Sequence, residues 1–187
     1  MITKALKSAA FVGIAMIGVL LLHLAALQLA GNFHVVAPDE AYRSAQPSAA
    51  DIAAYSERYG IRTVVNLRGA SRAPWYADEK RATAKLGIRL IDFPLSAATD
   101  VTPAQISSLA GLLKTADKPI LIHCKSGADR TGLASVIYLG EVAGADEATA
   151  EKQLSIWYGH VSLFGWSPTA AMERSWEREE IALGLDS

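Results

Sequence analysis

The stretch Pro119–Gly132 reads PILIHCKSGADRTG and decides the fold that we expect. Its first four residues are apolar, a pattern typical of a short strand that is buried on both faces. The loop Cys124–Arg130 follows, and the apolar run Leu133–Val142 predicts a helix after it. Ligands of parallel α/β sheets bind at the carboxyl ends of the strands. We therefore expect this loop to line a ligand site.

Strands and helices alternate on both sides of this stretch. β-branched runs predict strands over Ile61–Leu67 and Ile88–Leu95. Capping residues, glycines and prolines predict helices before, between and after these strands, over Ser48–Gly60, Trp75–Leu86, Thr102–Lys114, Asp146–Tyr158 and onward from Ser167–Pro168. The order predicts one α/β domain, in which helices flank a mostly parallel central sheet.

The composition excludes several kinds of site. The chain has 187 residues and a formal net charge of -1, so it lacks the basic surface of a general nucleic-acid binder, and we expect no nucleic-acid partner. Cys124 is its single cysteine, which rules out an intrachain disulfide and a multi-cysteine zinc site. The four histidines show no metal-ligand spacing. We expect neither a metal nor an organic cofactor.

The N-terminal segment predicts a membrane anchor. The run Ala9–Ala30 is 22 residues long and uncharged, and a helix needs about 20 residues to cross a bilayer. A cleaved signal peptide has a shorter apolar region of about 7–15 residues and ends in a cleavage site with the pattern small-x-small. The candidate cleavage site Gln28–Ala30 fits this pattern poorly, because its first residue is Gln28. We favour an anchor over a signal segment for residues 1–32, followed by one folded domain over residues 33–187.

The flanking charges predict the orientation of this anchor. Lys4 and Lys7 precede the span, whereas Asp39 and Glu40 are the first charges after it. The positive-inside tendency then leaves the N-terminus in the cytoplasm and the domain outside it, in the periplasm of a Gram-negative cell. A helix that lies on the membrane surface would need a charged face, which this segment lacks.

The surroundings of Cys124 suit a nucleophilic thiolate, although a lone cysteine is more often a small buried side chain. The start of the following helix directs amide groups and the positive end of its dipole at the sulfur. Arg130 adds a full positive charge, and the Thr131 hydroxyl is able to donate to the sulfur.

The same loop suits an oxyanion with tetrahedral geometry. Its backbone amides can curl into an anion nest, and Gly127 permits a conformation that other residues avoid. Arg130 binds two phosphate oxygens with a planar fork. A phosphate ester held in line with Cys124 would react through a phosphocysteine intermediate that water hydrolyses. The predicted substrate-binding residues are Lys125, Ser126, Gly127, Ala128, Asp129 and Arg130.

The string His123–Gly132 resembles the signature of protein tyrosine and dual-specificity phosphatases, bacterial members in particular. Tyr42–Ser48 and Val64–Arg68 resemble stretches of the atypical, plant-and-fungal-like dual-specificity branch. The resemblance covers roughly residues 33–158 and implies the cysteine-phosphatase fold. It implies that Cys124 and Arg130 are catalytic, that His123 and Thr131 stabilise the thiolate, and that Arg43, Arg68 and Arg72 lie near the pocket rim.

The general acid is left open between two residues, and that neither of them serves is the third alternative. The leaving oxygen needs a proton, and the resemblance implies an Asp after the strand Ile88–Leu95. No carboxylate follows that strand until Asp100. Asp129 is the competitor, because related bacterial phosphatases carry an Asp just before the signature Arg. Asp92 lies inside the strand, and we interpret it as structural. We expect Gln153 on a helix surface.

The predicted function is hydrolysis of phosphotyrosine or related phosphoprotein sites. A phosphoinositide, lipid-phosphate or inositol-phosphate substrate is the alternative, since an anchor would hold the pocket near a bilayer. Lys125 gives weak support to it. Two other classes remain, a rhodanese-like sulfurtransferase and an inactive phosphate-binding module. The aromatic residues Trp157, Tyr158, Phe164 and Trp166 are expected to pack against the C-terminal helices.

Overall fold

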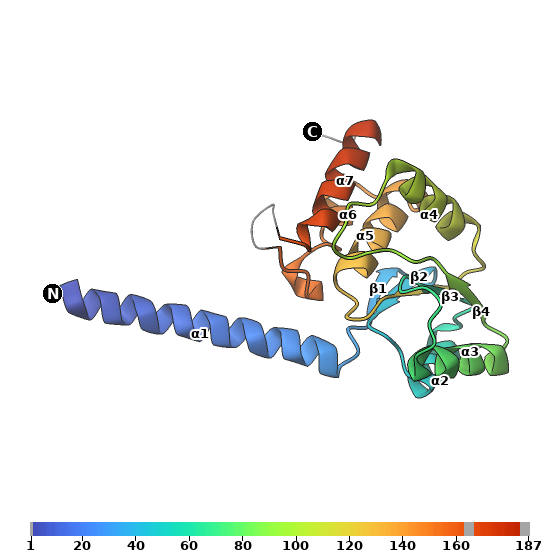
Figure 1. The fold of residues 1–187 in the computed structure, drawn as a ribbon, viewed down its shortest axis with the longest axis horizontal. Helices are drawn as coiled ribbons and strands as arrows, with labels where there is room; N and C mark the ends of the chain where they lie inside the picture. Colours follow the sequence, from blue (N-terminus) through green and yellow to red (C-terminus); the bar gives the residue numbers. More distant parts are fainter. Residues whose placement is uncertain (1, 163–166, 184–187) are drawn as a thin grey trace.

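The computed structural model describes residues 2–162 and 167–183, and it contains a five-stranded sheet (Figure 1). The sheet has the order β1-β2-β5-β3-β4. β1 is antiparallel to β2, and the other neighbours are parallel. The strands are β1 (His34–Ala37), β2 (Ala41–Ser44), β3 (Thr63–Asn66), β4 (Arg89–Asp92) and β5 (Ile120–His123). The predicted mostly parallel sheet is confirmed.

The register brings the ends of four strands to one edge of the sheet. His123, the last residue of β5, pairs with Ser44 at the end of β2 and with Asn66 at the end of β3. Asn66 pairs in turn with Asp92 at the end of β4. The loop that starts at Cys124 therefore leaves the centre of this edge.

Helices cover both faces of the sheet (Figure 1). Because side chains alternate along a strand, Val64 and Leu121 pack with α2 and α3, whereas Val65 and Ile122 pack on the opposite face. One layer consists of α2 (Ala49–Tyr59) and α3 (Pro74–Leu86). The other consists of α4 (Pro103–Thr115), α5 (Asp129–Ile137), α6 (Glu147–Glu151) and α7 (Ala170–Leu183).

Local signals fixed several of these helices as predicted. Ser48 and Thr102 each form a capping box, at the starts of α2 and α4. Gly60 and Gly87 end α2 and α3 in the left-handed conformation. These helix boundaries therefore match the prediction within a residue or two.

Other elements differ from the prediction. The hairpin of β1 and β2 was not predicted, because the buried strand β2 contains a charged residue, Arg43. α5 starts at Asp129 instead of Leu133 and continues as the π-helix η1 (Tyr138–Val142). The helix expected over Asp146–Tyr158 is wrong, because α6 ends at Glu151. The rest of the predicted range contains the short 3-10 helix η2 (Ile156–Tyr158).

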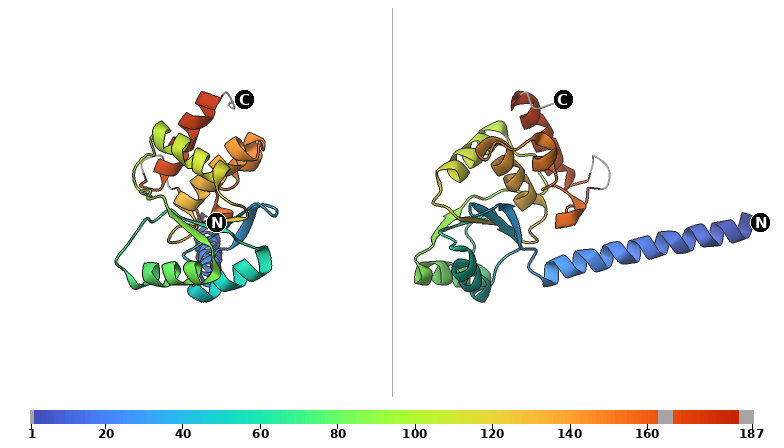
Figure 2. Two further views of the ribbon diagram at one scale, coloured as in Figure 1. Left: turned by 90° about the vertical axis from the view of Figure 1, so that its right-hand side faces the viewer. Right: turned by 180° about the vertical axis from the view of Figure 1, so that it is seen from behind.

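α1 (Ile2–Leu29) is one continuous helix, and its N-terminal part projects away from the domain (Figures 1 and 2). Phe11 and Leu22 on it are 74% and 72% exposed. Within the described residues, the stretch Ala10–Leu29 is the one helix long and apolar enough to cross a membrane. Such exposed apolar surface is costly in water, so this helix has the properties of an element that is covered by other apolar material.

Candidate active site

The Cys124 loop is wedged against the end of β2. Cys124 follows β5 directly and is 2% exposed. Gly127 has φ of +73°, and a Cβ atom there would lie 2.7 Å from the backbone N of Ala45 and 2.7 Å from the backbone C of Ser44. Only glycine fits this backbone conformation and this close approach. The loop is therefore held in one shape by its fit against β2.

Arg43 braces the loop from behind. Its Nη2 donates to the Gly127 carbonyl (2.7 Å), and its Nη1 donates to the carbonyl (2.7 Å) and Oε1 (2.8 Å) of Gln153. Its guanidinium lies 4.2 Å from the centre of the Tyr158 ring. Burial lowers the pKa of Arg43 to about 10, so it is still a cation at neutral pH. The expectation that Arg43 lies at the pocket rim is wrong, because its side chain is fully buried.

Two amide side chains at the end of α1 hold the next carbonyl of the loop. Gln28 Nε2 and Asn32 Nδ2 donate to the Ser126 carbonyl at 3.0 and 2.9 Å. The backbone N of Gln46 donates to the Lys125 carbonyl (3.2 Å). With its carbonyls bonded from outside, the loop directs its N–H groups inward, which is the arrangement of an anion nest. Sequence reasoning missed Gln28 and Asn32, although polar residues at the end of an apolar run were a signal.

Arg130 and Thr131 offer donors that no described residue accepts. Arg130 Nη1 donates to the carbonyls of Leu67 (3.3 Å) and Leu95 (3.2 Å), which fixes the guanidinium beside the ends of β3 and β4. Among the described residues, buried Arg130 Nε and Thr131 Oγ1 have no hydrogen-bond partner. Buried donors without partners are costly. Their position on the loop indicates a site for an anion.

His123 connects the loop to a buried polar chain. Its Nδ1 lies 3.3 Å from the Cys124 carbonyl, and its Nε2 lies 2.6 Å from Glu79 Oε1. Glu79 Oε2 accepts from Gln46 Nε2 (3.4 Å), and Gln46 Oε1 accepts from Arg68 Nη1 (2.7 Å). His123 thus contacts the backbone of Cys124. Nothing in the local sequence indicated Glu79, which comes from α3.

Arg68 is the last residue of this series of hydrogen bonds. Its guanidinium stacks on Trp75, 3.6 Å from the ring centre. Burial lowers the pKa of Arg68, the Arg130 cation lowers it further, and Cys124 acts in the opposite direction. These interactions are consistent with a position near the pocket rim. Lys125 and Arg72 are exposed.

Asp100 is paired with α7. Its Oδ1 lies 2.6 Å from Arg174 Nη2, and its Oδ2 lies 2.7 Å from Arg178 Nη1. Hydrogen bonds from Arg174 and then Arg178 hold the pKa of Asp100 below its usual value. These contacts stabilise the carboxylate, which is the form that cannot donate a proton.

Asp129 lies in the first turn of α5 and contacts a buried histidine. Asp129 Oδ1 is 2.8 Å from His160 Nδ1, and His160 Nε2 is 3.1 Å from Glu173 Oε1. Burial acts to lower the pKa of His160, but the two carboxylates outweigh it and the net shift is upward. His160 therefore lies between two carboxylates that favour its protonated form. Its distance from Asp129 in the sequence hid this contact.

Among the other residues singled out in the sequence, Asp92 lies as expected, whereas Gln153 and Trp157 do not. Asp92 accepts from Asn66 Nδ2 (2.8 Å) and from the Tyr76 hydroxyl, which confirms its structural role. Gln153 is buried instead of lying on a helix surface, since its carbonyl and side chain bind Arg43. Trp157 is 71% exposed and does not pack as expected. Phe164 and Trp166 lie outside the described residues.

Comparisons with known proteins agree with this geometry. A model of the family described as DSP-PTPase phosphatase fused to NAD+ kinase matches residues 35–156, more than half of the chain. The dual specificity protein phosphatase TpbA of Pseudomonas aeruginosa is 32% identical over 116 residues, covering 60% of this chain and 49% of TpbA. The inositol diphosphatase DSP5 of Arabidopsis thaliana is 35% identical over 109 residues, covering 54% and 50%. This chain spans about half the length of these curated relatives.

Solved structures show the same fold. The crystal structure of Pseudomonas aeruginosa TpbA superposes with a TM-score of 0.61 at 26% identity, covering 83% of this chain and 91% of TpbA. A complex of a TpbA variant with phosphotyrosine superposes equally well. The catalytic core of the PP-IP phosphatase Siw14 from S. cerevisiae has a TM-score of 0.60 at 17% identity, covering 83% and 94%, which shows the fold alone. The match over residues 35–156 confirms the resemblance expected from His123–Gly132, and the chain belongs to the DSP-PTPase family of dual-specificity-like cysteine phosphatases.

Proposed function

We propose that this protein hydrolyses phosphate monoesters through a phosphocysteine intermediate, with phosphotyrosine or related phosphoprotein sites as its substrates. The observation that carries the proposal is the pair of buried donors, Arg130 Nε and Thr131 Oγ1, which lie where the Cys124 loop enters α5 and lack partners among the described residues. Family membership and the TpbA complex with phosphotyrosine support it.

The reaction divides into two displacements at phosphorus. The loop N–H groups and the Arg130 fork hold the non-bridging oxygens. The Cys124 thiolate attacks phosphorus, the bond to the leaving oxygen breaks, and that oxygen takes a proton from the general acid. Water then attacks phosphorus, gives a proton to the same carboxylate, and breaks the S–P bond. Inorganic phosphate leaves and the thiolate is restored.

We infer that Asp129 is the general acid and not Asp100. Asp129 directly precedes Arg130 at the start of α5, and its partner His160 is a titratable group that can lose its proton. Asp100 is instead held as a carboxylate by two guanidinium groups that stay charged, those of Arg174 and Arg178. His160 contacts Asp129 at 2.8 Å and is in this proposal a positioning residue that orients the carboxyl group.

Turnover of p-nitrophenyl phosphate by the full chain in detergent, with EDTA present, tests the chemistry. Activity that is lost in Cys124→Ser is expected. Turnover of thiosulfate instead would support a sulfurtransferase, and inertness toward every phosphate ester would leave a phosphate-binding module. Single-turnover trapping of acid-stable radiolabelled phosphate on the protein would report the intermediate directly.

A phosphorylated lipid or inositol phosphate is the second candidate substrate. It is supported by the name of DSP5, an inositol diphosphatase, and by the apolar helix α1. The full chain in vesicles distinguishes the candidates when kcat/KM is compared for a phosphotyrosine peptide, a phosphoinositide in the bilayer and a free inositol phosphate. A higher value for the peptide supports the first candidate.

We further propose that residues 1–32 anchor a catalytic domain of residues 33–187, with the N-terminus in the cytoplasm and the domain outside it. The length of α1 and the positions of Lys4 and Lys7 before the span support this orientation. Protease added to intact spheroplasts is expected to degrade the domain. Protection of the domain would reverse the orientation, and a mature chain that lacks residues 1–30 would indicate a cleaved signal.

A further inference from the structure

The two polar side chains near the end of α1 both turn toward the domain. His23 Nε2 lies 3.0 Å from the Ile156 carbonyl, and the His23 ring meets Trp157 edge to face with 6.1 Å between the ring centres. Gln28 binds the Ser126 carbonyl of the phosphate loop (3.0 Å). The last third of α1 is therefore attached along the domain and not only at its end.

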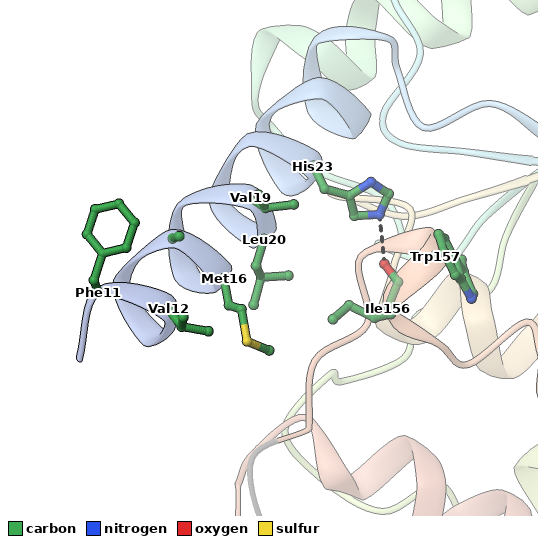
Figure 3. Close-up of a pocket in the computed structure, with 9 residues that line it drawn as sticks. Phe11, Val12, Met16, Val19, Leu20, His23, Ile156 and Trp157 are labelled. Carbon is green, nitrogen blue, oxygen red and sulfur yellow. Dashed lines mark hydrogen bonds between the residues drawn. The ribbon is translucent and has the colours of Figure 1, made fainter. Parts of the chain in front are cut away.

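An apolar groove lies between α1 and η2 (Figure 3). Its volume is about 490 Å³, and its residues come from one side of α1, Phe11 to His23, and from Ile156 and Trp157. Its lining is apolar apart from the His23 ring and the indole N–H of Trp157, and His23 Nε2 lies 3.0 Å from the Ile156 carbonyl. A groove of this size and composition suits a hydrocarbon chain.

The domain side of the groove is exposed to an unusual degree. Trp157 is 71% exposed and Ile156 is 42% exposed, although both are large and apolar. Adjacent exposed apolar residues beside an exposed apolar helix make one continuous patch, which a soluble surface rarely carries. Tryptophan is enriched at the boundary between lipid headgroups and acyl chains.

We propose that this groove is a membrane-docking surface, in which lipid acyl chains fill the space between α1 and the turn Ile156–Trp157. We choose lipid as the occupant because one side of the groove is formed by α1. If α1 spans the bilayer, the groove beside it is open to the acyl chains. His23 lies six residues before Leu29, which is about 9 Å along the helix axis. Apolar faces of interfacial elements enter the bilayer by about 5–10 Å.

Docking of this turn fixes how the catalytic domain faces the membrane. α1 alone would permit rotation about its axis, whereas a second contact at Trp157 removes that freedom. Asn32, just after α1, links the Cys124 loop to η2, because its Nδ2 donates to the Ser126 carbonyl (2.9 Å) and to the Tyr158 carbonyl (2.9 Å). The proposal rests on the proposed membrane span and is independent of the phosphatase activity.

Spin labels on single cysteines test it in the full chain. Cys124→Ser removes the one native cysteine, and Ile156→Cys places a label on the turn. Leu86→Cys is the matched control, because Leu86 at the end of α3 is 41% exposed and Ile156 is 42% exposed. Leu22→Cys, on the exposed part of α1, reports whether the helix is inserted. Each chain is reconstituted in phosphatidylcholine vesicles, and label collisions with oxygen and with a water-soluble nickel chelate are compared.

At positions 156 and 22, oxygen is expected to broaden the spin-label resonance lines more than the nickel chelate does. At position 86, the nickel chelate is expected to broaden them more than oxygen does. A label at 156 that behaves like the one at 86, while position 22 is lipid-exposed, overturns docking and leaves the anchor intact. Labels at 22 and 156 that both face water overturn the anchor as well. Spin–spin broadening at 156 that disappears on dilution with unlabelled chain would assign the groove to a second copy and overturn the lipid.

An independent measurement uses the native residue. Dibrominated phosphatidylcholine is expected to quench part of the tryptophan fluorescence of the full chain, and Trp157→Phe is expected to remove most of the quenched part. Equal quenching of both proteins would contradict the docking of Trp157. Neither readout depends on catalysis, so failure of the phosphatase proposal would not alter them.

Discussion

The loop after β5 and the segment after β4 reach the same edge of the sheet but are held in different ways. In the first, Cys124, Gly127 and Ala128 are buried, and Arg43 bonds the loop carbonyls from inside the protein. In the second, Ser96, Ala98 and Thr99 are exposed, and Asp100 is held by two ion pairs that are themselves 35–47% exposed. Exposed pairs contribute about 0–1 kcal/mol. The molecule therefore fixes the shape of the Cys124 loop through burial and leaves the segment after β4 weakly held.

The largest expected effect lies in the buried loop. Cys124→Ser is expected to lower kcat on the order of 10⁶-fold, the scale seen when a nucleophile is removed from a hydrolase. The hydroxyl is a much weaker nucleophile in the same position. Tight binding of phosphotyrosine by this variant, measured by calorimetry, serves as its control for folding. Retained turnover would remove Cys124 from the mechanism.

The second prediction contrasts the two candidate acids. Asp129→Asn is expected to lower kcat for p-nitrophenyl phosphate by about 10²–10⁴-fold, the range of general acid catalysis, and to flatten the basic limb of the pH profile. Asp100→Asn is expected to leave that limb in place, since it removes only ion pairs to Arg174 and Arg178. The opposite outcome would transfer the role to Asp100 and would mean that the segment after β4 closes over the pocket.

The third prediction concerns the shape of the loop. Gly127→Ala is expected to cost about 1–3 kcal/mol of unfolding free energy through overpacking, because its Cβ would meet the backbone of Ser44 and Ala45. Gly111→Ala, at an exposed position of α4, is the matched control and is expected to gain about 0.5–1 kcal/mol of unfolding free energy, since glycine weakens a helix interior. Urea titration measures both. Equal changes in unfolding free energy for the two variants would show that the Cys124 loop can accommodate a Cβ atom at position 127.

The smallest expected effect is a pH dependence of stability at His160. Because the folded pKa of His160 is raised above the usual 6.5, its contribution is complete below about pH 6.5 and is lost as the pH rises through the folded value. The difference in unfolding free energy between wild type and His160→Asn should therefore shrink from pH 6 to pH 8. A difference that grows over this range would mean that His160 is neutral in the folded protein.

The sequence predicted the elements whose signals are local. The start of α2 at Ser48 and of α4 at Thr102 could be predicted because a capping box is complete within four residues. β5 and the loop after it could be predicted because burial, spacing and the following helix occur within one stretch, residues 119–142.

What escaped prediction depends on contacts between distant residues. Arg43 in a buried strand contradicts an apolar pattern until its partners, Gly127 and Gln153, are known. The same contact explains why the helix after Asp146 ends early, since Gln153 turns into the core to meet Arg43. Asp100 and Arg174 are 74 positions apart, so no local signal indicated that this carboxylate is already paired.

The two amide side chains that donate to the Ser126 carbonyl tie the end of α1 directly to the Cys124 loop. With α1 in a bilayer, the enzyme would work in a thin layer of fixed height above the lipid and would find its substrates by diffusion in two dimensions. A phosphate group would then be selected by its height above the membrane as much as by the residues around it. Lengthening the segment between Leu29 and Asn32 would widen that layer and change which substrates are within reach.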